Sequence, residues 1–285
     1  EARLAARIRH PNAVGTLDIS DTQGDGYFLV MEYVEGDHFG ALLRQAARGG
    51  ERLPVPVVAR VVMDALAGLH AAHHLTDATG ELLDLVHRDV SPHNILVGAD
   101  GVGRITDFGV AKAQVRLSST RDGQFKGKLS YMAPEQAASG AADQRSDLFS
   151  MGIVLWEALT GRRLFRGENN ADVLNKILDP QVPPPSTFDA KLAPFDAVTG
   201  RALARDPDAR FQAAEDFLDA VEAAALEGGG VATPRTVGKE VERWLGEKIA
   251  RERQQIRESI DALGRSEPKP GVLPRPAESD SQPSQ

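Results

Sequence analysis

The sequence predicts an α+β chain in which a few strands come first and helices make up most of the rest. Residues 17–19 and 27–31 are rich in β-favouring side chains and flank a turn-rich segment at 20–26. From Pro54 onward, apolar residues recur at helical spacing. With 285 residues, of which 41% are apolar, the chain is long enough to bury a core.

The first residues indicate the end of an amphipathic helix. Leu4 and Ile8 are interleaved with arginines, and His10–Pro11 stops the helix because the residue before a proline is pushed out of the helical region. Glu1 is therefore expected to lie inside a helix. A chain that opens in mid-helix without an initiator Met is expected to be truncated.

Four further helices are predicted from apolar spacing. They cover residues 58–69, 147–160, 195–204 and 211–226. The helix at 147–160 is apolar nearly all round, so we expect it to run through the core and to end at Gly161. Asp206–Pro207 is a stop and restart signal between the last two helices.

The C-terminal part is predicted to leave the compact domain. Gly228–Gly230 is expected to end that domain. A charged helix over 239–263 then carries an apolar stripe, explained either by packing on the main domain, which we favour, or by binding a partner helix. Residues 264–285 are rich in Pro, Ser and Glu and are predicted to be a disordered tail.

Composition argues against several classes of function. Lys and Arg number 33 against 41 Asp and Glu, a net charge of −8, which argues against a broad nucleic-acid or membrane-surface footprint. The lack of Cys excludes disulfides, thiolate catalysis and Cys-ligated zinc, and it favours a reducing, cytoplasmic compartment. No apolar run is expected to reach the roughly 18 residues of a membrane span, although the sequence leaves open an anchor outside this chain. Partners are expected to be small molecules or proteins.

Residues 86–109 suggest a metal site at the end of a hairpin. Asp100-Gly101 is a hairpin signal between β-like segments. A two-residue turn there would place Asn94 opposite Asp107, with about 5 Å between the Cα atoms. A carboxylate and an amide oxygen suit Mg²⁺, which binds through one or two such groups plus substrate phosphates.

Asp89 lies five residues before Asn94 and is expected to project toward the same point. There it can accept a proton from an attacking hydroxyl. Taken singly, each of these residues is also explained as an ordinary hairpin or turn residue, so the functional hypothesis depends on the set.

As a set, these residues resemble the catalytic motifs of the protein kinase family. The motifs are His87-Arg88-Asp89 with Asn94, then Asp107-Phe108-Gly109, then Ala133-Pro134-Glu135. The resemblance runs from Glu1 to about Leu226. It implies a protein-kinase-like fold with an incomplete small β lobe at 1–34, a mostly helical large lobe at 35–226, a linker and charged helix at 227–263, and the tail at 264–285.

The resemblance also implies ATP and Mg²⁺ as cofactors, and it implies roles for single residues. Asp89 resembles the catalytic base, and Asn94 and Asp107 resemble the Mg²⁺ ligands. Residues around the nucleotide are implied at Glu1 (the helix C glutamate), Met31 (the gatekeeper), Glu32, Tyr33 and Val34 (the hinge, whose backbone binds adenine) and Leu96 (the pocket floor).

Structural and regulatory roles are carried over in the same way. They are Asp147 as the anchor of the catalytic loop, His87 and Phe108 as regulatory-spine residues, and Glu135 with Arg210 as a buried ion pair. A plain surface position is the alternative for Arg210.

Arg88, directly before Asp89, resembles the arginine of kinases that are activated by phosphorylation of the activation loop. In this loop Ser118, Ser119 and Thr120 are candidate phosphorylation sites because basic residues lie close to them in the sequence. An ordinary polar loop is the alternative.

Two positions depart from the pattern of Ser/Thr-specific family members. Ser91 stands where these members usually carry Lys, and Lys128 stands where they usually carry Thr. We hypothesise a reciprocal exchange, in which Lys128 supplies the cation and Ser91 the hydroxyl of the catalytic cleft. Reduced activity is the alternative.

The stretch 73–85 is longer than the family usually has. Ala78-Thr79-Gly80 suggests a small surface hairpin, and His73 and His74 are expected to be capping or solvated rather than metal-bound. The exchange at Ser91 and Lys128 and the long stretch 73–85 both resemble bacterial kinases of the eukaryotic type. No Gly-rich loop or Val-Ala-x-Lys strand is found, so these 285 residues alone are expected to bind nucleotide weakly and to turn over little or not at all.

For the intact protein, of which this chain is expected to be a fragment without the Gly-rich loop and the ATP-binding lysine, the sequence therefore predicts a serine/threonine protein kinase that transfers the γ-phosphoryl group of ATP to a protein Ser or Thr. Tyr specificity is less favoured, because Tyr131-Met132-Ala133-Pro134-Glu135-Gln136 resembles bacterial Ser/Thr kinases. The rival interpretation is a non-catalytic, pseudokinase-like scaffold with the helix at 239–263 as its partner surface. Retention of Asp89, Asn94 and Asp107 speaks against the scaffold.

Overall fold

The computed structural model describes residues 4, 6–21, 27–108 and 129–266, and it confirms the α+β prediction. The strands are β1 (Thr16–Asp21), β2 (Tyr27–Met31), β3 (Gly36–His38), β4 (Ile95–Gly98) and β5 (Gly103–Ile105). The α-helices are α2 (Phe39–Arg48), α3 (Val55–His73), α6 (Pro134–Ser139), α7 (Gln144–Thr160), α8 (Asn170–Leu178), α9 (Asp196–Ala202), α10 (Ala214–Glu227) and α11 (Pro234–Ser266). The described residues also form the 3₁₀ turns η1 (Pro185–Thr187), η2 (Ala190–Phe195) and η3 (Pro207–Ala209).

The described strands form two small antiparallel sheets, β1-β2 and β3-β4-β5. The segment before β1 runs beside β5, because the Val14 N–H donates to the Ile105 carbonyl and the Ile105 N–H donates to the Asn12 carbonyl, both at 2.9 Å. Strand β3 and helix α2 were not predicted. They lie before Pro54, where the helical spacing of apolar residues had been expected to begin.

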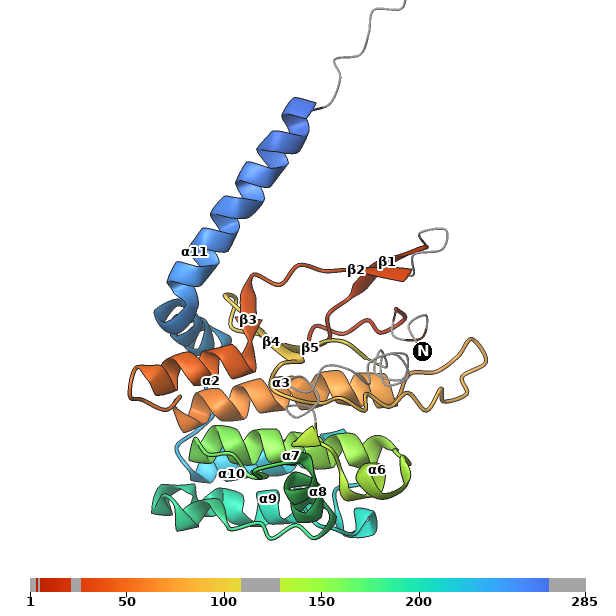
Figure 1. Cartoon of the computed structure of the whole chain (residues 1–285), viewed down its shortest axis with the longest axis vertical. Coiled ribbons are helices and arrows are strands. Elements are labelled where there is room, and N and C mark those ends of the chain that lie inside the picture. Colours follow the sequence, from red (N-terminus) through yellow and green to blue (C-terminus); the bar gives the residue numbers. More distant parts are fainter. Residues whose placement is uncertain (1–3, 5, 22–26, 109–128, 267–285) are drawn as a thin grey trace, which may run out of the picture. The chain divides into compact units, whose positions relative to one another are not determined.

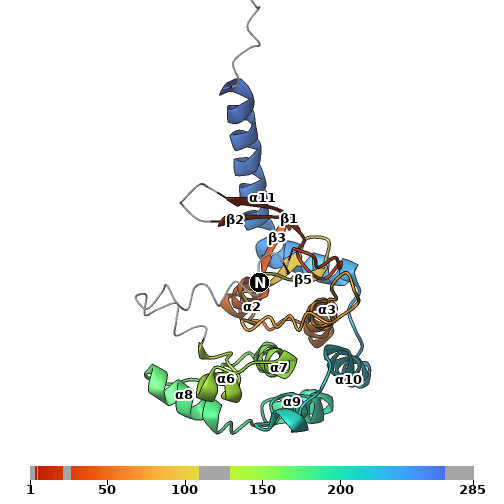
Figure 2. The ribbon, with the colours of Figure 1, turned by 90° about the vertical axis from the view of Figure 1, so that its right-hand side faces the viewer.

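Helices α3 and α7 form the centre of the core. Helix α3 packs on β5, on α7 and on α10, and Figures 1 and 2 show it between the three-stranded sheet and α7. Helix α7 is buried along nearly its whole length, from Ser146 to Thr160, and ends at Gly161 with a left-handed φ of 67°, as predicted.

Helix α3 corrects the prediction that no apolar run is long enough to cross a membrane. An 18-residue window in Val55–His73 has a mean hydropathy of 1.5, which meets the length and composition criteria for a span. Within the fold, 67% of that window is buried, as in the core helix of a globular domain. The sequence pattern had been interpreted as a helix with one buried face, but α3 is covered on several sides.

The compact unit extends beyond the glycines that were predicted to end it. It comprises residues 1–246, and a second unit comprises 247–285. The first part of α11 belongs to the compact unit, where Val237, Val241 and Leu245 are buried. This part of the predicted 239–263 partner surface is therefore core, in agreement with the favoured interpretation.

In the second unit, described up to Ser266, α11 continues with a Lys248–Glu252 ion pair at 3.3 Å. Ile256, Ile260 and Leu263 are exposed on it. Almost all of the predicted disordered tail, 264–285, lies outside the described residues.

Candidate active site

The buried carboxylate of Asp147 holds the loop that carries the predicted catalytic residues. Its Oδ2 accepts hydrogen bonds from the His87 N–H at 2.8 Å and from His73 Nε2 at 2.9 Å, and its Oδ1 accepts one from the Arg88 N–H at 2.7 Å. Asp147 is buried in the core because it lies in the first turn of the core helix α7. The geometry therefore places Asp147 as an anchor of the loop.

His73 differs from its prediction. It is buried against Asp147, whereas the sequence had suggested a capping or solvated residue. The reason is its place at the last turn of α3, which packs on α7. His74 does cap that helix end, because its Nδ1 contacts the His70 carbonyl at 3.0 Å.

The hairpin predicted at residues 78–80 is present beyond that helix. Thr76 and Leu82 form a bridge, and the Asp77 carboxylate accepts from the Thr79 N–H at 2.7 Å. Gly80 takes a φ of 87° in the turn.

His87 and Phe108 link the loop to the segment after β5. His87 Nε2 contacts the Thr106 carbonyl at 2.8 Å, and its ring lies 4.8 Å from the Phe108 ring, centroid to centroid. Both side chains are buried. Contact between the two predicted spine residues fixes the start of the segment that follows Asp107.

Asn94 is oriented by Asp89. Its Nδ2 donates to the Asp89 carbonyl at 2.7 Å and to Asp89 Oδ2 at 3.2 Å. The amide nitrogen is thus committed to Asp89, which leaves the Asn94 carbonyl oxygen as the acceptor for a ligand. The predicted base and the first predicted metal ligand are therefore in direct contact.

The hairpin between β4 and β5 has a different register from the one predicted. The Gly98 N–H donates to the Val102 carbonyl at 3.1 Å, so the loop contains the three residues Ala99, Asp100 and Gly101 rather than two. Gly101 takes the left-handed position of such a loop, with φ 76°. The register shifts by one residue, and the Thr106 N–H donates to the Asn94 carbonyl at 3.0 Å.

Asn94 therefore faces Thr106 and not Asp107, which lies one residue further on. Asp107 has a φ of 63°, so its side-chain direction does not follow the alternation of the strand. Of the three described non-glycine residues with positive φ, two, Arg88 and Asp107, belong to the predicted site. Such backbone strain, worth about 1–3 kcal/mol at each residue, persists where the surrounding structure holds it.

The donor set suits Mg²⁺. Asn94 offers an amide oxygen, and Asp107 is an exposed carboxylate at the same end of the hairpin. Within the described residues, no group of three or more His, Asp or Glu side chains is positioned to hold a metal ion. Two oxygen ligands match a cation that keeps further ligands from water and phosphates, rather than a fully protein-bound metal.

The residues of the predicted hinge differ in how they use their backbone groups. The Glu32 N–H donates to the Gly15 carbonyl at 2.9 Å, and the Glu32 side chain accepts from the Gly15 N–H at 3.2 Å. No hydrogen bond between described residues uses the N–H or carbonyl of Val34. Leu96 lies on β4 opposite Arg104 of β5 and is half-buried.

Glu135 and Arg210 form the ion pair that was predicted for them. Arg210 donates from Nη1 and Nη2 to the two Glu135 oxygens, both at 2.8 Å, and its side chain is 0% exposed, which excludes a surface position. Burial alone would raise the pKa of Glu135, but hydrogen bonds from Arg210 and Ser146 outweigh it and hold that pKa below its usual value. The pair ties α6 to the segment before α10.

Glu157 and Arg163 form a polar group with the buried Tyr131, and the sequence did not predict it. The Tyr131 hydroxyl donates to Glu157 Oε2 at 2.7 Å, and Arg163 contacts both side chains. Burial raises the pKa of Tyr131. The only signal in the sequence was a Glu within the apolar helix α7, a position where a charge needs a partner.

Outside the described residues lie Glu1, Gly109, Ser118, Ser119, Thr120 and Lys128. Ser91 is described and buried, and its carbonyl accepts the Asn94 N–H at 3.0 Å.

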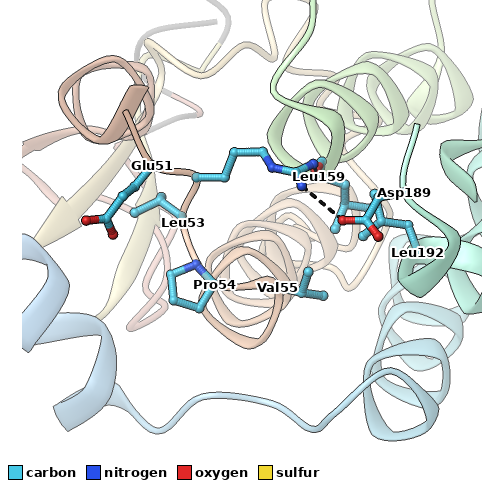
Figure 3. Close-up of a pocket in the computed structure, with 8 residues that line it drawn as sticks. Glu51, Leu53, Pro54, Val55, Leu159, Asp189 and Leu192 are labelled. Atoms are coloured by element: carbon cyan, nitrogen blue, oxygen red, sulfur yellow. Dashed lines mark hydrogen bonds and ion pairs between the residues drawn. The ribbon is translucent and has the colours of Figure 1, made fainter. Parts of the chain in front are cut away.

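A surface pocket of about 350 Å³ lies apart from these residues. It is lined by Glu51, Arg52, Leu53, Pro54, Val55, Leu159, Asp189 and Leu192. Figure 3 shows it, and its dashed line marks the Arg52–Asp189 ion pair at 2.9 Å. No predicted site residue lines it, so it is not the candidate active site.

Comparisons with known proteins point to one family. Residues 1–219 match the protein kinase domain family. The chain is 42% identical over 259 residues to the tyrosine-protein kinase MasK of Myxococcus xanthus, covering 90% of this chain and 40% of MasK. It is 37% identical over 230 residues to the serine/threonine-protein kinase PknL of Mycobacterium tuberculosis, covering 80% of this chain and 54% of PknL.

The fold is likewise similar to a solved structure, the kinase domain of Mycobacterium tuberculosis PknI. The TM-score is 0.58 at 27% identity, over 78% of this chain and 75% of that one. The chain spans about half or less of the length of the curated relatives it matches.

Proposed function

Because this chain belongs to the protein kinase family, we propose that the full-length protein transfers the γ-phosphoryl group of ATP to serine or threonine side chains of a protein substrate. The protein-kinase-like fold and the relationship to bacterial kinases are shown by the comparisons. The acceptor residue and the assignment of each catalytic group are the proposal.

The observation that carries the proposal is the contact between Asp89 and Asn94 on a loop anchored by Asp147. The hydrogen bond from Asn94 orients the Asp89 carboxylate, which would accept the proton of the attacking hydroxyl. The two backbone hydrogen bonds to Asp147 keep the loop from moving, and positioning is most of what a protein supplies in phosphoryl transfer.

Asn94 and Asp107 would hold Mg²⁺ together with the ATP phosphates. When bound, Mg²⁺ supplies positive charge that neutralises the phosphate oxygens. The Glu32 carbonyl and the Val34 backbone would bind the adenine edge above Leu96. We keep the hypothesis that Lys128 supplies the cation, and Ser91 the hydroxyl, that other Ser/Thr kinases obtain from the reverse arrangement.

Tyrosine is a second candidate acceptor. The relative MasK is named a tyrosine-protein kinase at 42% identity, whereas PknL at 37% identity is named a serine/threonine-protein kinase. Phosphoamino-acid analysis of the reaction product distinguishes the two acceptors.

The test uses the full-length protein with ATP, Mg²⁺ and a general protein substrate. Asp89→Asn is expected to reduce the phosphorylation rate by roughly 10²–10⁴-fold, because it removes a general base. Asp107→Asn is expected to abolish the Mg²⁺-dependent part of ATP binding. The matched control is Asp219→Asn, an exposed carboxylate on α10, which should change neither measurement.

Other outcomes separate the alternatives. A wild-type protein that neither binds Mg²⁺–ATP nor phosphorylates any substrate would support the scaffold interpretation. Full activity of Lys128→Met would refute the exchange with Ser91. Unchanged turnover after Ala replaces Ser118, Ser119 and Thr120 together would exclude activation through these residues.

A further inference from the structure

Segment 232–246 leads into helix α11 and forms its first part. It lies beyond residues 1–219, which match the protein kinase domain family, and it belongs to the compact unit. It contacts the β4-β5 hairpin, helix α3 and the end of α2. Its buried aliphatic side chains are Ala232, Val237, Val241 and Leu245.

The loop between β4 and β5 lies directly against the first turns of α11 (Figure 1). A Cβ added at Gly238 would lie 2.7 Å from the Ala99 carbonyl oxygen, and one added at Gly101 would overlap the Pro234 carbonyl. Main chain therefore meets main chain at a distance that leaves no room for a side chain at either glycine. Neither the loop nor the helix can shift toward the other.

A series of polar contacts joins the same segment to β5 through α3. The Ala232 N–H donates to the Pro56 carbonyl, and the Ala232 carbonyl accepts from Arg60 Nε, both at 3.0 Å. Arg60 Nη1 donates to Asp64 Oδ1 at 3.5 Å, and Asp64 Oδ2 accepts the Gly103 N–H at 2.9 Å. Asp64 is buried, so breaking its bond to Gly103 would leave a buried polar group unsatisfied.

The hairpin held in this way carries the groups of the proposed site. At its tip, the Ala99 N–H donates at 2.7 Å to the carbonyl of Glu35, the residue after Val34 of the predicted hinge. Asn94 directly precedes β4, and Asp107 follows β5 by two residues. A shift of the hairpin would therefore move the adenine edge and the metal ligands together.

The other end of segment 232–246 is fixed at the end of α2. Arg243 donates from Nη1 and Nη2 to the two Glu51 oxygens at 3.0 and 2.6 Å, but this ion pair is exposed and contributes little. The Trp244 ring lies against Gly49, where an added Cβ would be 2.5 Å from it. Trp244 Nε1 donates to Glu240 at 3.0 Å, which orients the ring. Packing of Trp244 and of the buried aliphatic side chains thus holds the segment in place.

We propose that segment 232–246 is a clamp that holds the β4-β5 hairpin against the hinge and thereby sets the affinity of the full-length protein for Mg²⁺–ATP. The effect on affinity rests on the proposed kinase function, whereas the clamp itself rests on the contacts above. Groups that position a substrate lose much of their effect when they are displaced by about 1 Å. Nucleotide affinity therefore depends on residues outside 1–219, and release of the segment lowers it.

The first test measures the clamp without nucleotide, by hydrogen–deuterium exchange of the full-length protein. Gly238→Leu places a side chain against the Ala99 carbonyl. The matched control is Gly246→Leu, because the atoms nearest to a Cβ at Gly246 belong to the flexible Glu242 side chain. Both variants replace a glycine of α11 by a good helix former, so their gain in helix propensity is the same.

The Ala99 and Gly103 amides are expected to exchange about tenfold faster in Gly238→Leu than in wild type, because the hairpin opens more readily once the clamp is displaced. In Gly246→Leu the exchange rates of these amides should stay within about twofold of wild type.

The second test measures the Kd of a fluorescent ATP analogue with Mg²⁺, at a temperature at which circular dichroism shows each variant to be folded. Gly238→Leu is expected to weaken binding about tenfold through lost positioning, and Gly246→Leu to change it less than about twofold. Gly238→Ala introduces a smaller group at the same contact and should fall between them. It keeps both tests decisive if the Leu variant does not fold.

Unchanged exchange of the Ala99 and Gly103 amides in folded Gly238→Leu and Gly238→Ala would overturn the clamp. Faster exchange with an unchanged Kd would overturn the control of nucleotide affinity, since the segment would then contribute to stability alone. A wild-type protein that binds no Mg²⁺–ATP would refute the proposed function and, with it, the effect on affinity. The exchange measurement would still decide whether the clamp exists.

Discussion

Asp147 holds two segments, the end of α3 and the start of the catalytic loop, at one carboxylate. His73 ends α3, whereas the backbones of His87 and Arg88 start the catalytic loop, and all three donate to Asp147. The residue is 1% exposed, so water does not replace a lost bond. The sequence predicted that Asp147 lies at the start of an apolar helix, but it did not predict that His73 is its partner.

Asp147→Asn is expected to lower the free energy of unfolding by about 3 kcal/mol, because an amide nitrogen would face a buried donor and leave it unsatisfied. Urea unfolding of the full-length protein measures this, with Asp219→Asn as the exposed control. A difference below about 1 kcal/mol between the two variants would show that the anchor is dispensable.

The hairpin β4-β5 shows how one element sets the site. An Asp-Gly pair predicts a turn, but turn type and loop length decide the register. Here Asp100 Oδ1 accepts the Val102 N–H at 3.1 Å, and Gly101 takes the left-handed position, which favours the three-residue loop. The hairpin itself was predictable, and the register, shifted by one residue, was not.

Substitutions at Gly80 and Gly101 can distinguish the cost of backbone strain from the cost of a steric clash. At Gly101, an added Cβ would lie 1.8 Å from the Pro234 carbonyl oxygen, and φ is +76°. At Gly80, φ is +87° but no atom lies within 4 Å. Gly80→Ala is therefore expected to cost about 1 kcal/mol from strain alone, and Gly101→Ala about 2 kcal/mol more, because the start of α11 must also move.

Thermal or urea unfolding of both variants measures the difference. Equal losses for the two variants would mean that the contact between the hairpin and Pro234 adds no stability. A larger loss for Gly80→Ala would contradict the steric argument altogether.

On the scale of the whole molecule, the compact unit includes more chain than the sequence indicated. Gly228–Gly230 is a strong local break, and the break is real, since α10 ends at Glu227 and Gly229 and Gly230 have positive φ. The chain then returns to bury Val237, Val241 and Leu245 within the same unit. A local signal cannot reveal such a return, because the contacts that decide it come from distant segments.

A chain that ends at Gly230 is expected to be less stable than one that ends at Ser266 by several kcal/mol, because each buried aliphatic side chain contributes about 1.5–3 kcal/mol. The shorter chain should also bind a dye that detects exposed apolar surface. Differential scanning fluorimetry and dye binding compare the two. Identical melting temperatures would show that α11 is not part of the core.

The sequence alone determined the class of fold, the central helix at 147–160, the catalytic motifs and the Glu135–Arg210 pair, because these depend on local periodicity or on residues whose order along the chain is distinctive. Tertiary structure alone decided the hairpin register, the burial of His73 and the packing of α11. Each of these features depends on contacts between residues that are far apart in the sequence. Such contacts produce no periodic pattern along the chain from which they could be predicted.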